Sequence, residues 1–97
     1  MVNINWTDEA SFWLKDINDY IAQENPKIAK KVVNEIFTKT QILSSFPKLG
    51  YPYEDNTNNE IRILLYGHYR IAYLIKDTET IDILGVFHGA LAIERYL

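Results

Sequence analysis

Two apolar stripes with helical spacing, separated only by Asn25 and Pro26, constrain this chain more than any other feature. In the first stripe, between about Thr7 and Glu24, apolar residues recur every three or four positions: Ala10, Trp13, Leu14, Ile17, Tyr20 and Ile21. The second stripe begins at once and runs to about Ser45: Ala29, Val32, Val33, Ile36, Thr40 and Leu43. So short a connection predicts two antiparallel helices packed as a hairpin.

The ends of both predicted helices carry suitable residues. Thr7 can cap the first helix, Asn25 can cap the second, and Pro26 suits a first helical position. The Phe-Pro-Lys-Leu-Gly segment that follows ends helical structure. We expect Phe46 and Leu49, in that segment, to fold back into the core.

Alternation of apolar and polar residues predicts strands at both ends of the chain. The first covers residues 2–6, and three more cover residues 61–65, 69–75 and 81–87, joined by short turns. The sequence therefore predicts an α+β fold of order β-α-α-β-β-β: an antiparallel sheet with the N-terminal helical hairpin packed on one face. We expect the other face of the sheet to stay available to macromolecules.

The length of 97 residues indicates a single domain spanning 1–97, and the absence of cysteine excludes disulfides and thiolate metal sites. No apolar run is long enough to span a membrane, and the first residues lack the features of a signal peptide, so we expect a cytoplasmic protein. The formal net charge is −3, yet residues 26–48 carry five lysines against one glutamate. This basic stretch is either a solvated helix face or a surface for an acidic partner.

Five segments in order give the chain a family resemblance over nearly its whole length: "INWTDEA", "INDYIAQENPKIAKKVV", "LSSFPKLGYP", "IRILLYGHYRIAYLI" and "ILGVFHGALAIERYL". Together they resemble the RelE/ParE superfamily of small bacterial toxins from type II toxin–antitoxin modules, some of which are called plasmid stabilisation proteins. The "HGA" and "LG" elements look closest to the ParE branch. The resemblance implies the same α+β fold that the periodicity predicts.

The resemblance also implies a protein partner, because toxins of this family are held by an antitoxin tail that wraps them as an extended segment and a helix. Apolar residues outside the two core stripes are the candidate contacts: Phe12, Ile28, Ile42 and Phe46. The alternative is incidental apolar surface, which is common in proteins. We expect a hetero-oligomer with the antitoxin.

The two branches of the superfamily imply different chemistry. The RelE branch cuts messenger RNA on the ribosome. In this chain, the residues at positions that resemble its functional ones are Arg70, His88, Tyr96 and, with weaker support, Arg62. Arg70 alternates out of phase with the apolar residues around it, so it should lie on the sheet face that the family uses as its active site. Each residue also has a structural alternative: Arg70 pairs with Asp82 across the sheet, Arg62 is likewise a strand arginine paired across the sheet, His88 ends its strand, and Tyr96 packs.

The ParE branch, by contrast, poisons DNA gyrase without nuclease chemistry. Residues 51–60 hold three acids and no Lys or Arg, which disfavours binding to RNA, and Leu91 stands where the family commonly has Arg. We therefore expect a ParE-like toxin that inhibits a cellular target, DNA gyrase, and is neutralised by an antitoxin. The alternatives are a ribosome-dependent mRNA endonuclease and a decayed toxin that only binds its antitoxin. No nucleotide-binding or metal-ligand motif is present, so no cofactor or metal is expected.

Overall fold

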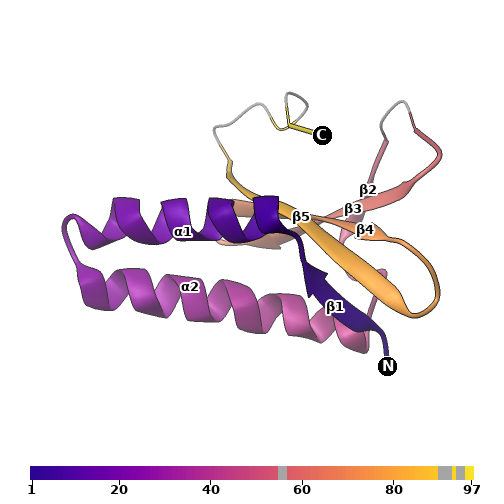
Figure 1. The fold of residues 1–97 in the computed structure, drawn as a ribbon, viewed down its shortest axis with the longest axis horizontal. Helices are drawn as coiled ribbons and strands as arrows, with labels where there is room; N and C mark the ends of the chain where they lie inside the picture. Colours follow the sequence, from indigo (N-terminus) through magenta and orange to yellow (C-terminus); the bar gives the residue numbers. More distant parts are fainter. Residues whose placement is uncertain (55–56, 90–92, 94–95) are drawn as a thin grey trace.

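A helical hairpin lies on one face of a five-stranded sheet (Figure 1). The computed structural model describes residues 1–54, 57–89, 93 and 96–97. The elements in chain order are β1 (Asn3–Trp6), α1 (Asp8–Ala22), α2 (Pro26–Gln41), the 3-10 turn η1 (Ile42–Ser44), β2 (Tyr51–Tyr53), β3 (Glu60–Tyr66), β4 (Tyr69–Ile75) and β5 (Thr80–His88). The predicted α+β class is confirmed.

Both helices begin at the predicted caps. The side-chain oxygen of Thr7 accepts the N–H of Ala10 at 3.1 Å, and that of Asn25 accepts the N–H of Ile28 at 3.1 Å. Pro26 occupies the first turn of α2, where its missing N–H costs nothing. Thr7 also donates a hydrogen bond of 2.7 Å to the carbonyl of Ile83, so the cap of α1 is tied directly to β5.

The buried face of the hairpin follows the two predicted stripes with one exception. Ala10, Ala29, Ile36 and Leu43 are completely buried. Tyr20 is instead 75% exposed. Ile17 and Ile21, one helical turn apart, mark the centre of the stripe, and Tyr20 lies at its edge. Its ring is therefore a surface feature of α1.

The strands run in the order β1-β5-β4-β3-β2 across the sheet. The predicted antiparallel meander of β3, β4 and β5 is confirmed. Two details differ from prediction: β1 pairs parallel to β5, from Asn3 beside Thr80 to Trp6 beside Ile83, and β2 adds a fifth strand against β3. β1 therefore pairs with β5, the last strand in the chain, rather than with the strand that follows the hairpin.

Apolar residues cover both faces of the sheet. The core under the helices is formed on the sheet side by Leu64, Ile71, Tyr73, Ile81, Ile83 and Val86. On the opposite face a second cluster contains Ile63, Ala72, Phe87 and Ile93, with Trp13, Tyr53, Leu84 and Leu97 packed against it. The expectation of an uncovered far face is therefore wrong, because residues from the C-terminal segment pack on it.

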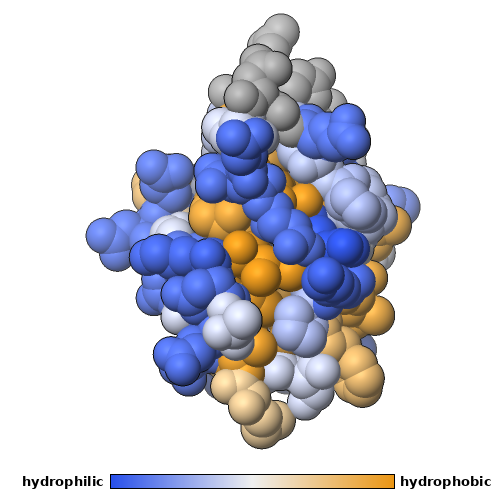
Figure 2. Space-filling model, turned by 90° about the vertical axis from the view of Figure 1, so that its right-hand side faces the viewer, coloured by the Kyte–Doolittle hydropathy of each residue, from blue (hydrophilic) through white to orange (hydrophobic). Residues whose placement is uncertain are grey.

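The apolar interior also reaches the surface at the end of the molecule that carries β1 and the β4–β5 turn. Viewed from that end, apolar surface forms a band between hydrophilic borders (Figure 2). Val2 just before β1, Ile4 in β1 and Ile75 at the end of β4 are partly buried and pack against the main core. Within the described ranges, no helix is both long and apolar enough to cross a membrane.

Candidate functional site

A groove of about 490 Å³ runs beside α1, at the ends of β4 and β5. The residues that line it are Trp13, Asp16, Ile17, Asp19, Tyr20, Gln23, Tyr69, Val86 and His88. Its walls are thus largely aromatic and apolar, with the carboxylates of Asp16 and Asp19 as its acidic groups. Such a groove suits the apolar face of a helical or extended peptide.

Two tyrosines and a lysine set the electrostatics of this groove. Burial raises the pKa of Tyr69, and the neighbouring Tyr20 adds to the shift. On the rim, Lys15 donates to Asp19 at 2.6 Å, which raises the lysine pKa and lowers that of the carboxyl. Because both partners are fully exposed, this ion pair contributes little to stability.

His88 is the last residue of β5 and lies opposite Tyr69 of β4. The two rings meet edge to face with centroids 5.7 Å apart, and the ring of His68 lies 6.4 Å from that of His88. The N–H of Gly89 then donates to the carbonyl of His68 at 2.7 Å, which ties the chain after β5 to the β3–β4 turn. In these contacts His88 ends its strand at the mouth of the groove.

Arg70 lies one position along β4, opposite Phe87 on β5 and Leu65 on β3. Since successive strand residues point to opposite faces, Arg70 and His88 leave the sheet on opposite sides. Both nevertheless line a shallow hollow of about 340 Å³ at this end of the sheet. The suggested pairing of Arg70 with Asp82 does not match the register: Asp82 lies opposite Leu74, and it accepts a hydrogen bond of 3.0 Å from Asn5.

Arg62 lies away from this hollow and holds the backbone of another loop. Its Nη1 donates to the carbonyl of Gly50 at 2.6 Å and to that of Lys48 at 3.3 Å, and its Nε donates to Glu60 at 3.1 Å. The guanidinium is therefore engaged by its own chain. The structure separates Arg62 from Arg70 and His88, with which the sequence grouped it.

Tyr96 belongs to an aromatic cluster. Its ring stacks on Phe87 with centroids 5.4 Å apart and meets the edge of Trp13 at 5.0 Å, while Trp13 and Phe87 meet at 4.9 Å. This cluster joins α1, β5 and the C-terminal segment. In these contacts Tyr96 has the packing role that was the structural alternative to a functional position of the RelE type.

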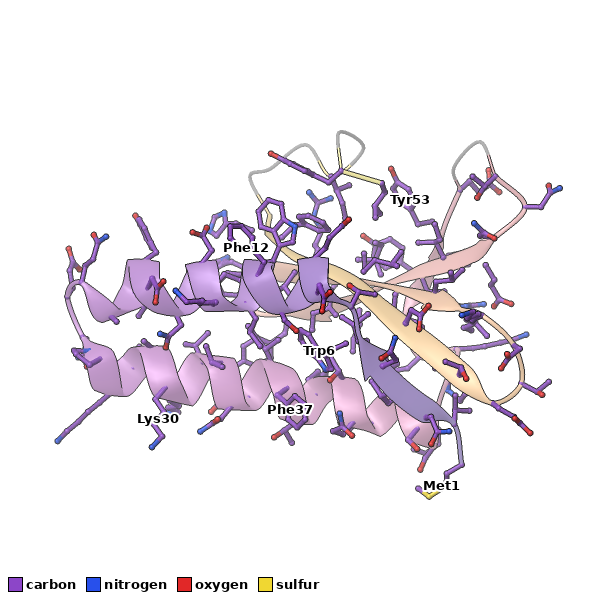
Figure 3. All side chains as sticks on the ribbon, viewed as in Figure 1. Met1, Trp6, Phe12, Lys30, Phe37 and Tyr53 are labelled. Atoms are coloured by element: carbon purple, nitrogen blue, oxygen red, sulfur yellow. The ribbon has the colours of Figure 1, made fainter. Side chains whose placement is uncertain are left out.

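The four candidate partner contacts are all exposed, with exposed fractions of 40–68% for Ile42, Ile28, Phe46 and Phe12. Figure 3 labels Phe12 on α1 and a further surface aromatic, Phe37, on α2. Phe37 was not among the predicted contacts; its ring stacks on that of Trp6 with centroids 6.1 Å apart. The only signal for it was an aromatic residue outside the second core stripe.

No group of three or more His, Asp or Glu side chains among the described residues is arranged to hold a metal ion. The groove combines aromatic rings with two carboxylates, and the hollow combines one arginine with two histidines and a tyrosine.

Comparison with known proteins agrees with this description. The family model "ParE toxin of type II toxin-antitoxin system, parDE" matches residues 4–92. "Putative toxin Y4kP" of Sinorhizobium fredii (strain NBRC 101917 / NGR234) is 33% identical over 86 residues, which cover 89% of this chain and 86% of the relative.

Two solved structures share the fold. A chain of the chromosomal ParDE toxin–antitoxin system from P. aeruginosa superposes with a TM-score of 0.74 and 23% identity, covering 91% of this chain and 96% of its own. A chain of the toxin–antitoxin complex RelBE2 from Mycobacterium tuberculosis gives a TM-score of 0.56 and 27% identity, covering 90% and 96%. With a family model matched over most of its length, the chain belongs to the ParE toxin family of type II toxin–antitoxin systems, within the RelE/ParE superfamily.

Proposed function

We propose that this protein is a ParE-like toxin that inhibits a cellular target, DNA gyrase, by binding it, and that a cognate antitoxin neutralises it. The observation that carries the proposal is the dispersal of the residues that an endoribonuclease of the RelE type would use. Arg62 holds the loop at residues 48–50, and Tyr96 packs on Phe87. Arg70 and His88 leave the sheet on opposite faces.

Ribonuclease chemistry would need these groups to converge. A base must take the 2′-hydroxyl proton, an acid must protonate the leaving oxygen, and cations must stabilise the charge that develops at phosphorus. Among the residues that the structure describes, the titratable side chains lining the hollow are those of Arg70, Tyr69 and the two histidines. The net charge of −3 also opposes the phosphate contacts on which RNA binding depends.

The groove beside α1 supports the antitoxin part of the proposal. Its aromatic wall suits the apolar face of a bound helix, and Asp16 and Asp19 suit basic residues beside that face. Phe12 and Ile28 are the proposed antitoxin contacts on the helical hairpin. The two solved neighbours are themselves named as toxin–antitoxin systems.

A pair of assays on the purified protein tests the proposal. We expect it to inhibit DNA supercoiling by purified gyrase, while transcripts in a translation extract stay intact. Cleavage of transcripts that disappears in Arg70→Ala would instead establish the mRNA endonuclease. Arg62→Ala serves as the matched control, because it removes an arginine that lies outside the hollow.

Growth of a host strain distinguishes an active toxin from a decayed one. Induction of the protein without antitoxin should arrest growth, and co-expression of the antitoxin should restore it. Normal growth after induction, with the folded protein present and antitoxin binding retained, would identify a decayed toxin and contradict the proposal.

A further inference from the structure

The loop between η1 and β2 is held by two side chains of the sheet. The hydroxyl of Tyr73 donates to the carbonyl of Pro47 at 2.7 Å and accepts the N–H of Gly50 at 2.9 Å. Arg62 donates to the carbonyls of Gly50 and Lys48. Four hydrogen bonds therefore fix the backbone of a loop only a few residues long.

This loop presents large apolar side chains to solvent. Phe46 is 62% exposed and Leu49 is 50% exposed, although we expected both to enter the core. Ile42, which is 40% exposed, is tied to the same loop by two backbone hydrogen bonds. The N–H of Phe46 donates to the Ile42 carbonyl at 3.0 Å, and the N–H of Leu49 donates to the Phe46 carbonyl at 3.1 Å. We call Ile42, Phe46 and Leu49 the 42–49 patch. Single exposed apolar residues are ordinary, whereas a group of them on one fixed loop is typical of a binding surface.

The charged residues beside the patch along the chain are lysines, while Arg62 and its partner Glu60 bring an ion pair to the same loop. From Ile36 to Tyr53 the chain contains Lys39 and Lys48 and no Asp or Glu. Lys48 is exposed and directly precedes Leu49. A partner that covers the patch must therefore offer an apolar pocket, and carboxylates beside that pocket would complement the lysines.

We infer that the 42–49 patch is the surface through which this toxin binds its target protein, at an apolar pocket bordered by acidic groups. This inference rests on the proposed function and reassigns Ile42 and Phe46, which the sequence suggested as antitoxin contacts, to a target surface distinct from the groove beside α1. Because Tyr73 and Arg62 already order the loop, binding does not incur the entropy of fixing it. The groove, with the carboxylates of Asp16 and Asp19, is then left for the antitoxin, and the target binds a surface flanked by lysines.

Inhibition of purified gyrase tests the inference with single substitutions in the full chain. Removing an anchor side chain in Phe46→Ala should raise the concentration for half-inhibition of supercoiling about tenfold or more. Lys48→Glu should raise it as well, and by more at low salt than at high salt, because exposed charges are screened. Phe37→Ala is the matched control, since it removes an aromatic side chain that is 48% exposed on α2, outside the patch, and should leave inhibition unchanged. Circular dichroism should show all three variants folded.

Three further measurements separate the possible outcomes. Calorimetry should give the same antitoxin affinity for Phe46→Ala as for the wild type, and a tenfold loss would assign the patch to the antitoxin and overturn the inference. Sedimentation should show that the wild type does not dimerise through the patch. A wild-type dimer that dissociates in Phe46→Ala would assign the patch to a second copy of the chain and overturn the inference. Inhibition by Phe46→Ala and Lys48→Glu equal to that of the wild type would also overturn it.

Growth arrest distinguishes a failed inference from a failed function. If the wild type arrests growth without inhibiting gyrase, the gyrase target is wrong, and loss of arrest in Phe46→Ala and Lys48→Glu still supports the patch. If arrest persists unchanged in both variants, the patch is not the target surface. A folded wild type that neither arrests growth nor inhibits gyrase overturns the function and the inference together.

Discussion

The hydroxyl of Tyr73 on β4 accepts the backbone N–H of Gly50, 23 residues earlier in the chain, at 2.9 Å. The same oxygen donates to the carbonyl of Pro47, so one side chain with no exposed surface satisfies a donor and an acceptor of the loop. Gly50 itself is required by close packing, because a Cβ there would lie 2.7 Å from the carbonyl oxygen of Ile63. The loop before β2 is thus seated on the centre of the sheet.

Tyr73→Phe should lower the free energy of unfolding by about 1–3 kcal/mol, because it leaves the Gly50 N–H and the Pro47 carbonyl without their partner. Urea denaturation followed by tryptophan fluorescence measures the change. Tyr51→Phe, at an exposed position on β2, is the control and should have little effect. Equal stability of Tyr73→Phe and the wild type would show that the hydroxyl does not stabilise the loop.

Alkaline pH should destabilise the protein through the same residue. Burial raises the pKa of Tyr73 above its ordinary value of 10.0, and burial also raises that of Tyr69. The native state therefore keeps these phenols protonated after the unfolded chain has begun to lose its protons, so stability falls as the pH rises above that value. Thermal melts across this range should show a smaller decline for Tyr73→Phe than for the wild type. An identical decline in both would exclude Tyr73 as a source of the effect.

The two helix caps should differ in strength. Asn25→Ala removes one hydrogen bond at the start of α2 and should cost about 1 kcal/mol. Thr7→Ala removes both the cap of α1 and the bond to the Ile83 carbonyl, so its cost should be roughly 2 kcal/mol. Chemical denaturation of the two variants side by side gives the comparison. If Asn25→Ala is the more damaging change, the tie between α1 and β5 has little energetic weight.

Tyr96→Ala should destabilise the protein by about 1–3 kcal/mol, because it removes two aromatic contacts, with Trp13 and with Phe87. Tyr96→Phe keeps both rings in contact and should retain nearly all of the stability. Equilibrium unfolding of the pair separates the ring from its hydroxyl. A large loss in Tyr96→Phe would point to a function of the hydroxyl instead of packing.

Phe12→Asp should weaken antitoxin binding by more than about 1 kcal/mol, since it places a charge on a proposed apolar contact. The fold should be retained, because Phe12 is 68% exposed. Isothermal titration calorimetry with the purified antitoxin measures the affinity. Ser11→Asp introduces the same charge one residue earlier and is the control; unchanged affinity in Phe12→Asp would remove this residue from the interface.

The helical hairpin could be predicted closely because each apolar stripe repeats over several turns and ends at a recognisable cap. The sheet could be predicted less well. Four alternating residues identify β1 as a strand but carry no information about its direction, and β2 is a three-residue segment with Pro52 at its centre. Strand alternation did correctly place Arg70 on the face opposite to Tyr69.

The roles of individual side chains were harder to predict because they depend on distant parts of the chain. The sequence suggested a core position for Leu49, and either a core position or a partner contact for Phe46, whereas the structure binds the backbone between them to Tyr73 and Arg62. Arg62 itself resembled a catalytic position, yet its partners lie 12 and 14 residues away in the loop. Nothing in a local pattern reports such contacts.

The position of β5, between β1 and β4, bears on how the protein is made. While the chain emerges from the ribosome, β1 and the helical hairpin leave first, but the strand that completes their core is translated near the end. A prematurely terminated product would lack that strand and expose the apolar side of the hairpin to chaperones and proteases. For the toxin proposed above, this chain order means that a copy truncated before β5 has no completed core and no finished surface with which to act.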